Sequence, residues 1–256
     1  MLDFLCVSIR VPKSGSESLD RLLRMAFAGR RIFYLPTTLD RDGKISRLQR
    51  LRFRRSQIKN LLLHYRSPSL RHAFAAIDSQ AENGDLIGGG HIDFPTLKAA
   101  LHRPIRMIAL LRDPISRVVS EYNYSRGIFL NRAALLRATL ATQPAMAGRY
   151  DFDGYLDFIE EHHTLYANPA CRYTGWNGVE DLAAFCARDV FHIGILERRQ
   201  QFADGLGQKM GKVLSFPHEN RTEAGSAIEI TPSRRARIER IFARDLALYE
   251  WVKTNM

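Results

Sequence analysis

Cysteine is scarce in this sequence of 256 residues, and its spacing excludes two classes of protein. Cys6, Cys171 and Cys186 are odd in number and lie far apart, so they form neither a disulfide framework nor a paired metal-ligand motif. A reducing compartment is the expected environment for such a chain.

Long hydrophobic runs are lacking as well. No stretch approaches the roughly 18 apolar residues of a membrane span. An apolar strand pattern begins at Phe4, so we expect no secretory signal segment. We therefore expect a cytoplasmic protein, and the alternative is a membrane-associated one whose anchor was removed. Internal repeats and low-complexity tracts are absent too.

Acidic residues are in the minority. The chain has 27 Asp and Glu against 38 Lys and Arg, which gives a formal net charge of +11. This balance favours an anionic partner, such as a nucleotide, an acidic polymer, a nucleic acid or a membrane surface. Hydrophobic residues make up 45% of the chain, enough for the full core of one large domain over residues 1–256.

Short apolar runs alternate with helical patterns along the chain. The predicted strands are residues 4–11, 32–35, 86–92, 105–111 and 190–196. The predicted helices are residues 46–64, 68–80, 114–125, 131–142, 152–163 and 179–187, with one last helix running from a Thr231 cap through Val252. Residues 143–149 and 219–227 read as loose connections. This alternation predicts a three-layer α/β/α fold with a central, mostly parallel sheet.

The stretch RVPKSGSESL, residues 10–19, joins the first predicted strand to a helix. Its loop combines Gly15, which allows close backbone approach, with serine hydroxyls and the ammonium of Lys13. Free backbone N–H groups and the helix dipole at such a junction favour phosphate binding. The loop is not a Walker A motif, because Lys13 precedes the only glycine. An ordinary Gly/Ser turn with a surface lysine is the alternative.

A second strand-to-helix junction lies in ALLRDPISRVVSEYNY, residues 109–124. Arg112 ends a buried strand, where a charge is costly unless it meets an anion. Pro114 starts the helix, and Ser120 lies two turns along it. A local ion pair between Arg112 and Asp113 is the alternative.

A third strand end carries GGGHIDF, residues 88–94. The three glycines before His91 allow a ligand to approach the backbone closely. His91 is a candidate general base, because imidazole titrates near the working pH of most enzymes. A structural histidine that bonds a backbone carbonyl is the alternative.

Together, PKSGSESL and RDPISRVVSEY resemble the sulfotransferases that use 3′-phosphoadenosine-5′-phosphosulfate (PAPS), and GGGHIDF is similar to their heparan/uronyl 2-O-sulfotransferase branch. The resemblance implies a P-loop-like fold and a single sulfotransferase domain. It implies transfer of a sulfuryl group from PAPS to a hydroxyl of an acceptor, a carbohydrate or glycan that is expected to be acidic. No metal and no nucleic acid take part in this scheme.

The resemblance also implies a role for individual residues. His91 would be the general base, Lys13 would neutralise the departing phosphate oxygen, and Arg10 would contact the acceptor together with His91. The remaining expected PAPS contacts fall into three groups. Those at the 5′ end are Lys13, Ser14, Gly15, Ser16, Glu17, Ser18 and Leu19, those at the 3′-phosphate are Arg112 and Ser120, and those in a later loop are Arg221 and Thr222.

Two carboxylates depart from the family pattern. Glu17 stands where a small polar residue is usual, so we expect its side chain to point away from the phosphosulfate. Glu121 stands where the glycan branch often has an aromatic residue, which affects the acceptor more than PAPS. The basic stretch at residues 47–59 is a candidate acceptor-binding helix, and the alternative is the wet face of an amphipathic helix. NPACRYTGW, residues 168–176, resembles a segment near the acceptor.

Two other functions compete with this interpretation. A P-loop-type ATP-dependent phosphotransferase would share the strand–loop–helix junction, although the Walker A spacing is missing. A non-enzymatic binder of an acidic polymer would follow from the net charge of +11. Magnesium dependence separates the first from a sulfotransferase, and indifference to Lys13 and His91 separates the second.

Overall fold

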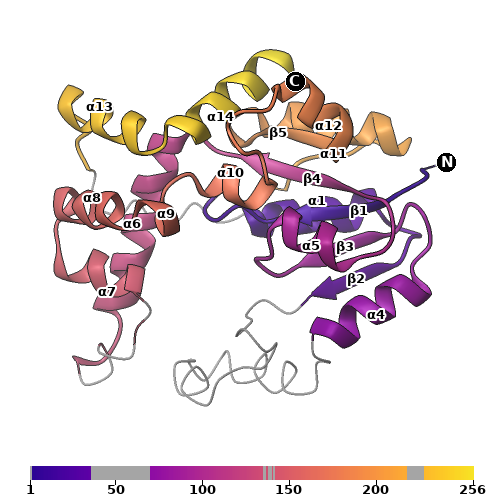
Figure 1. Ribbon diagram of the computed structural model, residues 1–256, viewed down its shortest axis with the longest axis horizontal. Helices are drawn as coiled ribbons and strands as arrows, with labels where there is room; N and C mark the ends of the chain where they lie inside the picture. The colour runs from indigo at the N-terminus through magenta and orange to yellow at the C-terminus, as the bar shows by residue number, and fades with distance from the viewer. Residues whose placement is uncertain (1, 36–69, 135–136, 138–139, 141, 218–227) are drawn as a thin grey trace.

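The structure is a computed structural model, and it describes residues 2–35, 70–134, 137, 140, 142–217 and 228–256. A twisted sheet forms the centre, with helices on both faces and a helical lobe at one side (Figure 1). The predictions at residues 46–64, the basic stretch 47–59, Arg221 and Thr222 fall outside the described residues.

The sheet has five strands in the order β2-β3-β1-β4-β5, and all of them are parallel. The strands are β1 (Leu5–Ile9), β2 (Ile32–Leu35), β3 (Leu86–Gly89), β4 (Ile105–Leu111) and β5 (Val190–Ile195). Because every strand runs the same way, all the carboxyl ends meet at one edge of the sheet. In open α/β sheets ligands bind at this edge, where successive crossovers diverge to the two sides. Here β1 is that point, since β3 and β4 flank it.

Helices cover both faces of the sheet and give it two separate cores. One face packs against α1 (Ser16–Ala26) and α12 (Arg199–Met210). The other packs against α4 (Leu70–Gln80), α5 (Phe94–Ala100), α10 (Pro169–Thr174), α11 (Leu182–Asp189) and α14 (Ala243–Asn255). The strands are therefore apolar on both sides, as the continuous runs in the sequence predict. The three-layer α/β/α prediction is confirmed.

A helical lobe carries a third core at the side of the sheet (Figure 1). It contains α6 (Pro114–Leu130), α7 (Thr142–Arg149), α8 (Phe152–Glu161), α9 (His163–Tyr166) and α13 (Pro232–Ile241). Helix α6 begins at the end of β4, so it connects the sheet to this lobe. Tyr155 and Phe242 lie at its centre and are fully buried.

The strand predictions are confirmed, although the predicted ends run one to three residues too far in β1, β3 and β5. The prediction of a single last helix is wrong, because the chain leaves helical geometry at Phe242 (φ −109°, ψ 30°). The bend lets the two halves bury their apolar stripes in different cores. Ile238 and Ile241 of α13 pack in the lobe, whereas Leu248 of α14 packs on the sheet.

The predictions between α6 and α8 are also wrong. Helix α6 continues to Leu130, and of the described positions in 131–142 only Thr142 is α-helical, as the first residue of α7. Residues 143–149, expected to be loose, belong to α7. Helix α7 packs on α6 through small residues, and Gly148 lies directly against the ring of Phe129. Because glycine has no apolar side chain, this contact does not appear as an apolar stripe in the sequence.

Other helices were missed or misplaced, since α5, α10 and α12 were not among the expected helices and α11 starts late. Helix α5 was not expected, yet its start is capped by Asp93, which accepts a hydrogen bond from Thr96 N. Helix α11 starts after its Asp181 cap, three residues later than the predicted position 179. In the part of the chain that the structure describes, no helix is long and apolar enough to cross a membrane.

Candidate active site

The candidate site lies at the carboxyl edge of the sheet, where three strand ends converge. Arg10 follows β1, His91 follows β3 and Arg112 follows β4. Arg112 Nη1 donates to the carbonyl of Lys13 at 3.2 Å, so the two junctions predicted from sequence touch each other. His91 Nδ1 lies 3.1 Å from the carbonyl of Arg10, which joins the end of β3 to the end of β1.

The loop between β1 and α1 has the backbone of an anion-binding turn. Lys13 (φ 65°) and Gly15 (φ 76°) are both left-handed, and Gly15 begins α1 without a side-chain cap. A Cβ on Gly15 would lie 2.9 Å from Leu196 Cδ1, so the loop is packed against the end of β5. The first N–H groups of α1 are therefore left for a ligand. The left-handed lysine is strained, a feature that clusters at functional sites.

Ser14 supplies an independent sign of a ligand at this loop. Its side chain is 2% exposed, and its Oγ has no hydrogen-bond partner among the described residues. A buried hydroxyl without a partner costs free energy, and an anion held by the loop would satisfy it. Arg10 Nε is likewise buried and unpartnered, although Arg10 Nη1 lies 3.7 Å from Asp20.

The other predicted loop residues divide by orientation. Ser16 is half-buried, and Ser18 is buried at the start of α1. Glu17 is exposed, and its orientation relative to a phosphosulfate stays a prediction. Leu19 is 1% exposed in the core under α1, and its N–H donates to the Gly15 carbonyl at 3.0 Å, so neither its side chain nor its N–H is left for a ligand.

Lys13 is half-buried and lies over an aromatic ring. Its Nζ is 3.8 Å from the centre of the Tyr124 ring, and Tyr124 itself is 52% exposed. Burial lowers the pKa of Lys13 and Arg112 lowers it further, whereas the carboxylates of Glu121 and Glu17 act in the opposite direction. A lysine with a lowered pKa gives up its proton more readily to a departing oxyanion.

Arg112 is the cation of the second junction. Burial lowers its pKa, the carboxylates of Glu197 and Asp113 raise it, and the guanidinium stays charged. The carboxylate of Asp113 accepts a hydrogen bond from Ser116 N at 2.8 Å and thereby caps α6. The Arg112–Asp113 ion pair, which was the alternative interpretation, is therefore only a part of the environment of Arg112. Ser120 is half-buried on α6, and its contact with a 3′-phosphate stays a prediction.

A buried polar cluster supports this junction from the helical lobe. Arg117 is 2% exposed and donates to Glu121 Oε2 at 2.6 Å, while Gln143 donates to Glu121 Oε1 at 3.1 Å. Glu121 therefore acts as a bound counter-charge between Arg117 and Lys13. The sequence carried one signal for it, the i, i+4 spacing of Arg117 and Glu121. Gln143 could not be found, since its helix was missed.

His91 has the geometry of a general base. A carbonyl only accepts, so Nδ1 beside the Arg10 carbonyl carries the proton and Nε2 keeps a free lone pair. The imidazole is exposed, but the atoms packed around it lower its pKa; the Arg10 charge lowers it too, while the Arg10 carbonyl bond and Asp20 raise it. Tyr173, which the sequence did not single out, meets His91 edge-on at 6.3 Å between ring centres.

Two glycines shape the approach to His91. Gly89 (φ 75°) and Gly90 (φ 66°) are both left-handed, and a Cβ on Gly89 would lie 2.8 Å from the carbonyl of Leu35. Only glycine fits this turn without strain. The backbone of Gly89 thus lies close to that of the neighbouring strand β2. The close approach of a ligand to these glycines stays a prediction.

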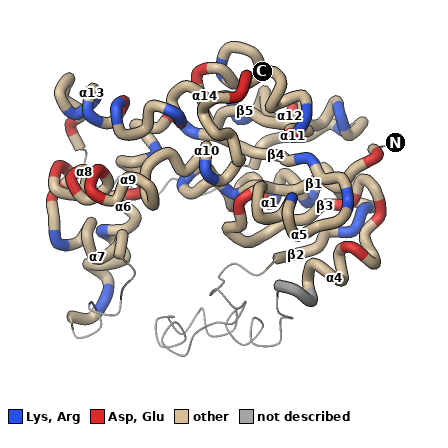
Figure 2. The backbone as a smooth tube through the Cα atoms, in the orientation of Figure 1, with Lys and Arg blue, Asp and Glu red and all other residues tan. Residues whose placement is uncertain are grey.

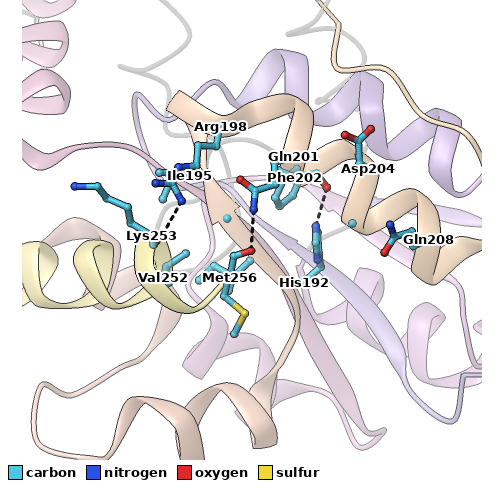
Figure 3. A pocket seen from close by; sticks show the side chains of 13 residues that line it. His192, Ile195, Arg198, Gln201, Phe202, Asp204, Gln208, Val252, Lys253 and Met256 are labelled. Atoms are coloured by element: carbon cyan, nitrogen blue, oxygen red, sulfur yellow. Dashed lines mark hydrogen bonds between the residues drawn. The ribbon is translucent and has the colours of Figure 1, made fainter.

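A cavity away from these strand ends lies at the outer edge of β5 between α12 and α14 (Figure 3). Its volume is about 290 Å³. His192 in its wall bonds the Phe202 carbonyl at 2.8 Å, and burial lowers the pKa of His192 to about 4. This histidine stays neutral and structural. Arg198 donates to the Lys253 carbonyl in α14, and Gln201 donates to the backbone oxygen of Met256 just after it, so both side chains hold α14 in place.

No protein-family model matches this chain, and no curated protein matches it either. The function is therefore argued from the geometry of the strand ends. Among the described residues no group of histidine, cysteine and carboxylate side chains is placed to hold a metal ion.

Proposed function

We propose that this protein is a sulfotransferase that moves a sulfuryl group from PAPS to a hydroxyl of a carbohydrate or glycan. One observation carries the proposal. The hydrogen bond from Arg112 to the Lys13 carbonyl joins two anion-binding junctions into one site, and His91 lies at the adjacent strand end. PAPS has anionic groups at two ends, which matches a site with two separate cationic junctions.

The backbone loop and the side-chain cation suit different ends of PAPS. The uncapped start of α1, with Gly15 and the unpartnered Ser14 hydroxyl, would bind the 5′-phosphosulfate. Arg112 would bind the 3′-phosphate, with Ser120 as a second donor.

The transfer itself needs a base, an in-line geometry and a stabilised leaving group. His91 Nε2 would take the proton of the acceptor hydroxyl while that oxygen forms a bond to sulfur. The bond between sulfur and the bridging phosphate oxygen would break, and its electron pair would stay on the phosphate. Lys13 would stabilise this oxygen, with the loop N–H groups, and 3′-phosphoadenosine-5′-phosphate would leave.

The acceptor would enter beside Tyr173, His91 and Arg10. Arg10 and the net charge of +11 favour an acidic glycan. Figure 2 shows Lys and Arg spread over the sheet helices and the helical lobe, with Asp and Glu between them. This distribution favours a local site over a broad polyanion-binding face in the described part of the chain. A cytoplasmic location is part of the proposal, supported by three free, buried cysteines.

Calorimetric titration of 3′-phosphoadenosine-5′-phosphate, the expected product, tests the cofactor class. We expect a dissociation constant of about 10 µM or tighter without magnesium. Lys13→Ala should weaken binding about tenfold, as a lost charge-assisted contact does. Lys253→Ala, at an exposed lysine on α14, is the matched control.

Failure of the folded protein to bind the product would overturn the proposal. Magnesium-dependent binding of ATP in its place would favour a phosphotransferase. Binding of an acidic polymer that ignores Lys13→Ala and His91→Ala would favour a non-enzymatic binder.

A further inference from the structure

A second cavity lies where α9, α10 and the start of α14 meet, and the proposed reaction does not use it. Its volume is about 270 Å³. The wall includes Thr164, Asn168, Arg172, Gly175, Trp176 and Arg244. A space of this size suits one sugar ring with its substituents.

Two guanidinium groups give this cavity its charge. Arg172 donates to the Leu165 carbonyl, and Arg244 Nη1 donates to the Asn177 carbonyl at 3.4 Å. Neither side chain pairs with a carboxylate among the described residues, and no carboxylate lines the cavity. Each arginine has five N–H donors, so most donors of both groups are left for a ligand.

The nearest acidic side chain beneath the wall is turned inward. Asp245 is 1% exposed, and its carboxylate accepts the N–H groups of Ala170 and Cys171 at 3.0 and 2.8 Å. It therefore fixes the start of α10 instead of reaching into the cavity. The polar wall keeps a net positive charge.

The cavity adjoins the proposed base through one aromatic ring. Arg172 Cζ lies 5.5 Å from the centre of the Tyr173 ring, and that ring lies 6.3 Å from the His91 ring. Gly175 closes the other side against Pro95, where an added Cβ would lie 2.7 Å from Pro95 Cγ. A sugar polymer with a hydroxyl at His91 can therefore extend past Tyr173 into the cavity.

We propose that Arg172 and Arg244 form a subsite for a carboxylate or sulfate group of the acceptor, one or two sugars away from the reacting hydroxyl. The assignment to an acceptor rests on the proposed function, whereas anion binding by the cavity does not. Two guanidinium groups match the planar, bidentate geometry of such anions.

The chain contains a built-in reporter for the subsite. It has two tryptophans, and Trp176 lines the cavity while Trp251 does not. The Trp176 indole N–H donates to the Glu180 carbonyl at 2.9 Å, so the indole ring has a fixed orientation in the cavity wall. Indole resonances of ¹⁵N-labelled protein should be followed during titration with a heparan-derived tetrasaccharide, and separately with inorganic sulfate at constant ionic strength.

We expect a saturable shift of Trp176 with the tetrasaccharide, and none of Trp251. Arg172→Gln and Arg244→Gln should each weaken binding about tenfold, because each removes a charge-assisted contact. Arg235→Gln is the matched control, since Arg235 is exposed on α13 and lies 3.8 Å from Glu239. Binding of 3′-phosphoadenosine-5′-phosphate should be unchanged in all three variants.

The outcomes separate this proposal from the proposed function. A Trp176 signal that stays still in the wild type, or a titration midpoint in both arginine variants equal to that of the wild type, overturns the subsite even if the nucleotide binds. A shift with inorganic sulfate but not with the tetrasaccharide identifies a small-ion site and overturns the acceptor role. Saturable tetrasaccharide binding without nucleotide binding upholds the subsite and overturns the transferase.

Discussion

The two strand-to-helix junctions of this protein look alike in sequence and differ in how they present positive charge. At the β1–α1 junction the helix start has no side-chain cap, so the backbone N–H groups themselves would bind the proposed ligand. At the β4–α6 junction Asp113 already caps the helix, so the positive charge comes from Arg112. A backbone site tolerates little change in main-chain geometry, whereas a side-chain site depends on one residue.

The third strand end, which carries His91, extends the comparison. We expect His91 to take part in the reaction without contributing to nucleotide binding. His91→Ala should lower the transfer rate about 100-fold or more, as loss of a general base does. Product binding at both junctions should stay unchanged. Transfer of radiolabelled sulfate from PAPS to a heparan acceptor measures the rate, and His102→Ala, at an exposed histidine paired with Asp78, is the control.

The pH profile gives the sign of this effect. Only neutral imidazole accepts a proton, so the rate should rise with pH and level off above the pKa of His91. Burial lowers this pKa, so the half-maximal rate should fall below the ordinary value of 6.5. A half-maximum above that value, or a full rate in His91→Ala, would contradict the role of His91.

Gly15→Ala should damage the backbone junction. The residue has a φ of 76°, and its new Cβ would lie 2.9 Å from Leu196 Cδ1. The left-handed conformation alone costs about 1–2 kcal/mol for a non-glycine residue. We expect lower stability in urea unfolding and nucleotide binding weakened by roughly tenfold or more.

Gly127→Ala is the matched change in the helix of the other junction. Nothing lies within 4 Å of its added Cβ, so stability should stay level or rise by about 0.5–1 kcal/mol. Equal loss of binding in both variants would mean that the β1–α1 loop holds no special geometry.

Asp113→Ala should affect the fold and spare the ligand. Removal of a helix cap costs about 1 kcal/mol, and Asp113→Asn should keep most of that stability. Nucleotide binding should stay equal or become slightly tighter, since a negative charge leaves the surroundings of Arg112. A tenfold loss of binding in both variants would show that the α6 start, and not Arg112, binds the anion.

Ser14→Ala should give the smallest effect. Its Oγ has no partner in the described structure, so the folded protein loses no hydrogen bond and stability should not fall. Nucleotide binding should weaken about two- to tenfold, the value of one hydrogen bond. Ser8→Ala, another buried and unpartnered hydroxyl on β1, should leave binding unchanged. Identical behaviour of the two variants would remove Ser14 from the site.

The sheet and the junctions were predictable because their signals are local. Buried parallel strands read as apolar runs, and Lys13, Gly15 and Arg112 follow such runs directly. The contacts between junctions were not predictable in the same way. Arg112 and Lys13 are 99 residues apart, and His91 and Arg10 are 81 apart, so only the strand order brings them together.

The helical lobe was the least predictable region. Its helix α7 packs through Gly148 and the buried Ala147, and such small contacts carry no periodic apolar pattern. The bend at Phe242 divides one amphipathic pattern between two cores, which a helical stripe alone does not reveal. The cluster of Arg117, Glu121 and Gln143 depends on the packing of α7 against α6, because Gln143 comes from α7.

The central claim is that the two junctions bind two ends of one ligand, and Arg112→Ala tests it most directly. Calorimetry should compare 3′-phosphoadenosine-5′-phosphate with adenosine 5′-phosphate, which lacks the 3′-phosphate. The wild type should prefer the bisphosphate about 10- to 100-fold, as expected for a charged contact of 1.5–3 kcal/mol. Arg112→Ala should bind both nucleotides alike. A wild type without this preference, or a variant that keeps it, would contradict the account.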